Sequence, residues 1–540
     1  MGKLISILCI AVAFSGMAFG DEDHHHEELT QQQLGTVHFS VSCTPEAERT
    51  FEKGVALLHS FWDEEAEKTF VEAAKQDPKC AMAYWGEAMS LWHQLWNRPD
   101  AATIKQGAAE LEQADELRPP TARERDYIHA LQAFYSNTPK ADHEARARAY
   151  SAAMETVYKK YPDDHEAAAF YALSLLASEP DDDTTFANRK QAGAILEKLF
   201  AEEPNHPGIA HYLIHTYDKP QLALLGLPAA RRYAQIAPVA PHALHMPSHI
   251  FARLGLWQDD IDSNLASIAA TRKATEMHMG GEGHQFHAMD YLVYAYMQSG
   301  REAEALKVIE EVKAMPPMKD MYGMGYDPRT NALVAFPARY EMEMHHWREA
   351  AALTPNPDAT GGDGSITYWA RAIGAARSGN VAQARSDIEH IEAIHKSLIE
   401  QKKKSFAEAV EQDRKEATAW LDHAEGRNDA AIASLRAIAE KQEASGDESD
   451  YETPAREMLA DMLLDMKRPG QALTEYKTSL KFFPNRFNSL YGAAQAAEMA
   501  GQTSEATEYY AVLVKTCEGG SSGRPELAKA KQAVVAKNNL

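Results

Sequence analysis

The chain has 540 residues, more than one hydrophobic core usually supports, so several domains or a repeat array are expected. It carries 55 basic and 79 acidic residues. The resulting formal net charge of −24 would repel phosphate backbones, so nucleic acid is not an expected partner. After the first segment, no stretch is long and apolar enough to predict a membrane-spanning helix.

The first segment, residues 1–20, has the pattern of a cleaved secretory signal. A lysine precedes an apolar run from Leu4 to Phe14, and small residues precede Asp21. The pattern predicts an exported mature chain, periplasmic or secreted. Residues 21–46 then form an N-terminal segment, in which three consecutive histidines at 24–26 could act as a secondary metal-capturing tail.

Signals for paired helices begin near residue 47. Gly54 is followed twelve residues later by Ala66, and then by Phe70 and Pro78. Small residues let two helices cross closely, an aromatic ring fills the space between them, and proline ends the second helix. This spacing predicts a first helix pair.

The same rhythm closes the array, where Tyr476 recurs 34 residues later as Tyr510. A period of 34 is that of the tetratricopeptide repeat, which the chain resembles over residues 47–516. The resemblance implies an all-α superhelical solenoid, and the turn signals give about eleven to twelve helix pairs, several degenerate or carrying insertions. Residues 517–540 are expected to be a flexible joint followed by a C-terminal helix.

The middle of the chain also resembles a group of exported bacterial repeat proteins without an established activity. The shared phrases lie at residues 57–62, 80–86 and 241–251. This likeness implies the fold and the export, but it gives no activity to transfer.

Three cysteines remain after removal of the signal. Cys43 and Cys80 each precede an expected first helix, one repeat apart, so a disulfide between them would clamp the first two repeats in an oxidising compartment. The alternative is two buried free thiols. Cys517 would stay unpaired near the C-terminal tail.

Histidine is concentrated in residues 206–287, which hold nine of the 23 histidines of the chain. His211 and His215 stand four residues apart, and His245 and His249 repeat this pair 34 residues later. Equivalent positions of consecutive repeats therefore carry imidazole, and stacking of the repeats brings those positions side by side.

In the family that the chain resembles, the first helix of each repeat lines the concave surface. The residues that this implies on one groove are His211, His215, His242, His245, His249, His287 and Asp290. Imidazole is the commonest transition-metal ligand, and two His-x3-His pairs on adjacent helices could complete a four-ligand site. The pattern favours a site for zinc, copper, nickel or iron, held by His211, His215, His245 and His249.

Two other functions stay open. The histidines could be polar packing residues in a groove that binds another exported protein or peptide, which would make the chain a scaffold. A metal-dependent enzyme would need a general base, for which Asp218, Glu276 and Glu282 are candidates without a distinguishing spacing. The His-Glu-x-x-His motif of zinc proteases is absent from the sequence.

A second candidate ligand groove lies near the N-terminus. Trp85, Met89 and Trp92 follow helical spacing, with His93 beside them. Such a stripe usually belongs to a hydrophobic core. If it faced the groove, it would suit an apolar peptide or a sugar ring.

Overall fold

The computed structural model describes residues 29–95, 98–136, 142–180, 183–279, 283–317, 327–359, 362–446 and 453–538. Within these ranges the chain forms helices and turns and contains no strand. None of these helices combines the length and apolar character needed to cross a membrane. The predicted signal at 1–20 and the histidines at 24–26 lie outside the described residues.

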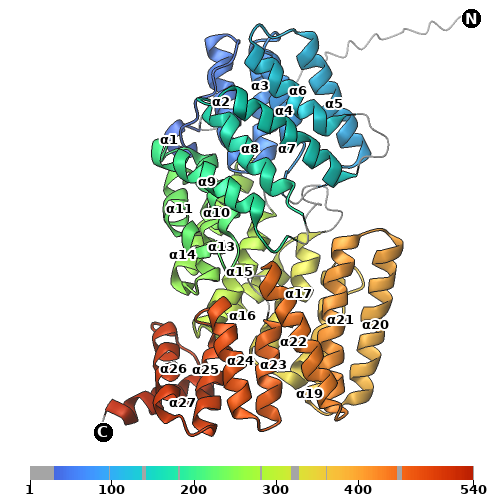
Figure 1. Cartoon of the computed structure of the whole chain (residues 1–540), viewed down its shortest axis with the longest axis vertical. Helices are drawn as coiled ribbons and strands as arrows, with labels where there is room; N and C mark the ends of the chain where they lie inside the picture. Colours follow the sequence, from blue (N-terminus) through green and yellow to red (C-terminus); the bar gives the residue numbers. More distant parts are fainter. Residues whose placement is uncertain are drawn as a thin grey trace, which may run out of the picture.

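From α2 to α26 the helices follow one another as antiparallel pairs, stacked side by side (Figure 1). The first six pairs are α2 (Pro45–His59) with α3 (Asp63–Gln76), α4 (Ala81–Ser90) with α5 (Ala101–Glu116), α6 (Ala122–Tyr135) with α7 (His143–Lys160), α8 (His165–Ala177) with α9 (Ala187–Glu202), α10 (Pro207–Tyr217) with α11 (Ala223–Ile236), and α12 (Pro241–His245) plus α13 (Pro247–Arg253) with α14 (Trp257–Glu276). The last six are α15 (His284–Gln298) with α16 (Glu302–Ala314), α17 (Pro328–Glu343) with α18 (Trp347–Ala352), α19 (Asp363–Arg377) with α20 (Val381–Glu400), α21 (Lys404–Ala424) with α22 (Asn428–Ser445), α23 (Ala455–Asp465) with α24 (Pro469–Phe482), and α25 (Phe487–Met499) with α26 (Thr503–Thr516). A short α1 (Gln31–Leu34) precedes the array and α27 (Pro525–Asn538) follows it.

The predicted all-α array of eleven to twelve helix pairs is confirmed, with twelve pairs in the described part of the chain. The residues that carried the prediction act as expected. A Cβ at Gly54 of α2 would approach the ring of Phe70 to 2.7 Å, so glycine is what lets that ring lie between the helices. Phe70 itself is fully buried.

The superhelix closes on itself twice, and its interior is filled by side chains. In the N-terminal half, His59 at the end of α2 reaches Glu166 of α8 and Tyr212 of α10, each at 2.8 Å. In the C-terminal half, Arg486 forms ion pairs with Glu343 of α17 at 2.6 Å and Glu457 of α23 at 2.7 Å. Each half has its own hydrophobic core, and the two cores meet around α13, α14 and α15.

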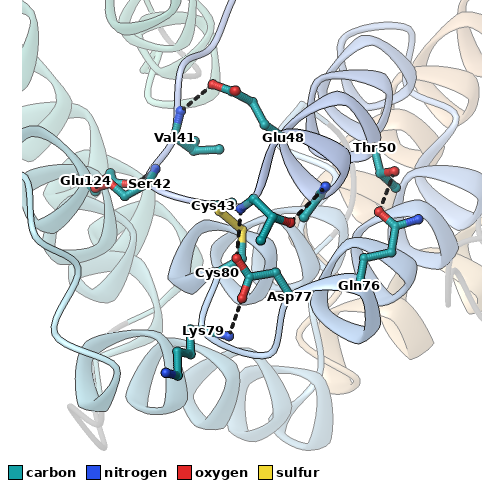
Figure 2. The surroundings of a disulfide bond; sticks show 12 residues. Val41, Ser42, Cys43, Glu48, Thr50, Gln76, Asp77, Lys79, Cys80 and Glu124 are labelled. Carbon is teal, nitrogen blue, oxygen red and sulfur yellow. Dashed lines mark hydrogen bonds between the residues drawn. A yellow bond between two sulfur atoms is a disulfide. The ribbon is translucent and has the colours of Figure 1, made fainter.

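The N-terminal segment packs into the first core, where the ring of Phe39 is completely buried. Cys43 in this segment forms a disulfide with Cys80 at the start of α4 (Figure 2). Beside the disulfide, Asp77 accepts hydrogen bonds from the backbone amides of Thr44 at 2.9 Å and Lys79 at 3.1 Å (Figure 2). The disulfide therefore ties the segment to the junction of the first two pairs.

The aromatic stripe of α4 belongs to the hydrophobic core and does not form the ligand groove that was the alternative. The side chains of Trp85, Met89 and Trp92 are each 1% exposed. Trp92 stacks on Phe134 of α6, with ring centroids 3.6 Å apart. His93 lies at the edge of this core, with its Nε2 3.6 Å from a carboxylate oxygen of Asp63.

The segment between α26 and α27, predicted to be a flexible joint, is anchored to the array. Ser522 and the backbone amide of Gly523 donate hydrogen bonds to Glu302 at 2.9 and 2.6 Å. Arg524 is buried and lies over the ring of Phe487, 3.6 Å from its centroid. Cys517 is a buried free cysteine.

Candidate metal centre

The histidine-rich helices lie where the two halves of the array meet. His211 and His215 lie one turn apart on α10, and the next pair supplies three more histidines from a divided first helix. Pro247 separates α12, which carries His242 and His245, from α13, which carries His249. His287 comes from α15 of the seventh pair.

Three imidazoles, those of His211, His215 and His242, form what we call the inner triad. The Nε2 atom of His211 lies 3.0 Å from that of His215 and 3.1 Å from that of His242. Because all three nitrogen atoms point at one another, a single ion between them could be bound by all three. The inner triad is deeply placed, and His211 has no exposed surface.

His245, His249 and His287 form a second group, the outer triad. The Nε2 atoms of His245 and His249 are 3.0 Å apart, and one ring nitrogen of each of the three lies within 4.8 Å of the others. His245 is 2% exposed, whereas His287 is reached by solvent. The outer triad is therefore the more accessible one.

The inner triad is oriented by a backbone carbonyl. The Nδ1 of His211 lies 2.6 Å from the carbonyl oxygen of His59, which can only accept, so Nδ1 carries the proton. The Nε2 of neutral His211 therefore has a lone pair that points into the triad. The ring of Tyr233 stacks on His211, with centroids 5.1 Å apart, and fixes its plane.

The outer triad is oriented in the same way by two side chains. The Nδ1 of His245 donates to Oδ1 of Asn264 at 2.7 Å, and Asn264 is held in this orientation by donating its amide to Asp260. The Nδ1 of His249 donates to Asp218 at 2.9 Å. Metal-ligating histidines almost always donate their second N–H to such partners, which fixes the ring and raises its basicity.

Burial keeps these imidazoles neutral. It lowers the pKa of His211 to about 3 and lowers the pKa values of His215, His242 and His245 well below 6.5, with the neighbouring imidazoles adding to the effect. Only a neutral imidazole can bind a metal ion. The lone pairs of these four rings are therefore available throughout the neutral pH range.

The carboxylate that orients the outer triad is ionised. Burial alone would raise the pKa of Asp218, but Arg253 and His249 outweigh it and hold that pKa well below its usual range. The Nε of Arg253 donates to Asp218 at 3.1 Å. Asp218, which the sequence suggested only as a general base, orients a histidine instead.

A third group, His59, Glu166 and His206, is completely buried but is not arranged as a metal site. The backbone amide of Ile209 donates to Nδ1 of His206, so its Nε2 carries a proton and donates to Glu166 at 2.9 Å. Tyr212 lies 2.8 Å from Nδ1 of His59, whose Nε2 faces Glu166 at 2.8 Å. The carboxylate thus accepts hydrogen bonds from two N–H groups and links α2, α8 and α10.

Two expectations about the ligand set are corrected. The histidines do not form one site from His211, His215, His245 and His249, because the next imidazole along the array approaches each pair and gives two groups of three. Asp290 belongs to neither group, since its buried carboxylate forms an ion pair with Arg339 of α17.

The histidines also do not line an open groove. The first helices face the interior of the superhelix as expected, but the ring of Phe61, just after α2, packs against the inner triad. This contact arises because the N-terminal half of the superhelix closes on itself and brings α2 against α10. The bond from His211 to the His59 carbonyl joins residues 152 positions apart in the same way. The inner triad is therefore buried.

The orienting residues gave little signal in the sequence. Asn264 lies on α14, the second helix of its pair, and the family pattern draws attention only to first helices. The carbonyl of His59 reaches the site only through closure of the superhelix. Asp218 directly follows α10, and a carboxylate three residues after His215 was the one available clue.

No protein-family model and no curated protein matches the sequence. Solved structures that are similar include the human IFIT1 dimer with m7Gppp-AAAA, at 13% identity and a TM-score of 0.33, covering 85% of this chain and 94% of that one. Another is the P58(IPK) TPR domain, at 12% identity and a TM-score of 0.20, covering 92% of this chain and 100% of that one. Similarities this weak say nothing about the ligand of the present protein.

Proposed function

We propose that this chain is an exported repeat protein that binds transition-metal ions through its two histidine triads. The observation that carries the proposal is the convergence of Nε2 atoms at 3.0 to 3.1 Å. On three of these rings, His211, His245 and His249, the Nδ1 atom donates to a fixed acceptor. A packing role would not need these lone pairs to face one another. Buried acceptors opposed in this way are costly unless a proton or a cation lies between them.

Export is part of the proposal and has two supports. Residues 1–20 have the sequence pattern of a secretory signal. The disulfide between Cys43 and Cys80 is of the kind that persists in oxidising compartments. The tetratricopeptide-like array then acts as a rigid frame, in which three neighbouring first helices present ligands at fixed positions.

The scaffold alternative, a groove that binds a polypeptide, is less well supported at this site. His211, His242 and His245 are between 0 and 4% exposed, and a peptide could not reach them without opening the array. Small ions need no such opening. A partner protein could still use the outer surface of the array, but no histidine in the triads would contribute to it.

The proposal is tested by metal analysis of mature protein purified without an affinity tag. Mass-spectrometric elemental analysis is expected to find a stoichiometric transition metal in the wild type and none in a His215→Ala/His249→Ala double variant, which removes one ligand from each triad. The exposed His390 provides a matched control, and His390→Ala should retain the metal. A wild-type protein that stays metal-free after incubation with zinc, copper, nickel and iron would overturn the proposal.

A further inference from the structure

The two triads are adjacent and built alike. Each combines two histidines spaced four residues apart with one imidazole from a neighbouring helix. In the outer triad this pair, His245 and His249, lies on either side of Pro247. The ring centroids of His242 and His245 are 6.1 Å apart, and those of His215 and His249 are 6.4 Å apart. Ions in both triads would therefore lie side by side, with imidazole rings between them.

Charge limits which ions can occupy both triads together. All six ligands are imidazoles, which carry no negative charge when they bind a metal ion, and neither triad includes a carboxylate from the described residues. Of the nearby carboxylates, Asp218 pairs with Arg253 and accepts a hydrogen bond from the triad ligand His249, and Asp290 pairs with Arg339. Two divalent ions would bring four positive charges to ligands that carry no negative charge, whereas two monovalent ions would bring half as many.

The aromatic lining limits the number of further ligands. The ring of Phe61 lies 4.4 Å from that of His211 and 5.6 Å from those of His215 and His242, measured between centroids. This apolar face offers no donor atom to an ion in the inner triad. Zinc held by three imidazoles takes a fourth ligand such as water, and non-haem iron usually takes a carboxylate, whereas copper(I) is stable with three imidazoles alone.

Building on the proposed metal-binding function, we infer that the triads form a paired copper centre that holds two monovalent copper ions, one in each triad. The outer ion is the more exchangeable one, because His287 is reached by solvent while His211 of the inner triad is not. The six imidazoles supply all the protein ligands of the pair.

The test is an anaerobic titration of chelator-treated, tag-free protein with copper(I), in competition with bicinchoninate as the optical probe. The wild type is expected to bind two equivalents. His215→Ala, which removes an inner ligand, and His287→Ala, which removes an outer one, should each bind one equivalent, and the double variant should bind none. Both positions are less buried than their triad partners, and His390→Ala serves as the control. Circular dichroism of each variant verifies that the helices remain.

The outcomes separate this inference from the proposal on which it rests. Binding of one copper(I) by the wild type would overturn the paired centre while leaving a metal-binding protein. Loss of both ions in either single variant would do the same. Stoichiometric zinc with no copper(I) uptake would overturn the choice of ion. Absence of binding with every metal would overturn both.

Discussion

The buried imidazoles should make the metal-free protein sensitive to acid, and His211 is the clearest single test. In the folded chain burial lowers the pKa of His211 to about 3, whereas an unfolded histidine titrates near 6.5. The folded state therefore favours the neutral ring. The stability that follows from this preference is present above pH 6.5 and is lost as the pH falls from 6.5 toward 3.

The expected size follows from one proton taken up on unfolding. Each pH unit between those limits costs about 1.4 kcal/mol, so lowering the pH from 6.5 to 5 removes about 2 kcal/mol through His211 alone. Replacing His211 with Gln removes this proton uptake. Whatever the variant loses at pH 7, its free energy of unfolding should fall about 2 kcal/mol less than that of the wild type between pH 7 and 5.

The assay is urea denaturation of chelator-treated protein at pH 7, 6 and 5, followed by circular dichroism. Comparing the variant with the wild type cancels the contributions of titrating groups that do not contact His211. His390→Gln, at an exposed position, controls for loss of an imidazole. Parallel pH dependence of the wild type and His211→Gln would refute the reasoning that burial keeps this ring neutral.

Three further outcomes are expected. Replacing Cys43 and Cys80 with Ser should lower the free energy of unfolding by about 4 kcal/mol, because the disulfide closes a loop with a sequence separation of 37. Unchanged urea denaturation would contradict this. Thiol labelling of denatured, unreduced wild type should find only Cys517. Glu166→Gln should lower the free energy of unfolding by about 3 kcal/mol, because it weakens the buried hydrogen bonds to His59 and His206, and should leave the metal content unchanged. Loss of metal on elemental analysis would instead make Glu166 a ligand. Asp290→Asn should also retain metal, since its carboxylate pairs with Arg339; a metal-free variant would restore the ligand role expected from the sequence.

The fold could be predicted because its signals are local. Gly54 and Phe70 determine how one helix pair packs, and the spacing from Tyr476 to Tyr510 repeats that packing one period later. Closure of the superhelix could not be predicted in this way. Small rotations at each repeat add up until His59 meets Glu166, 107 residues away, and no local spacing records that sum.

The candidate site was partly predictable for the same reason. A spacing of four residues on one helix brings His211 and His215 together, and the period of 34 gives His245 and His249. Which third imidazole joins each pair depends on how neighbouring helices cross, so the division into two triads emerged only from the structure. The acceptor on Asn264 lies on a second helix, beyond the reach of the repeat pattern.

The most direct test of the metal centre is an anomalous-difference map at the copper edge, from crystals of tag-free protein loaded with copper(I). Two peaks are expected, each about 2.0 Å from the Nε2 or Nδ1 atoms of one triad, the usual distance from a metal to an imidazole nitrogen. One peak lies among His211, His215 and His242, and the other among His245, His249 and His287. A map without density at either triad, or with its peak between His59, Glu166 and His206, would contradict the assignment of these histidines as metal ligands.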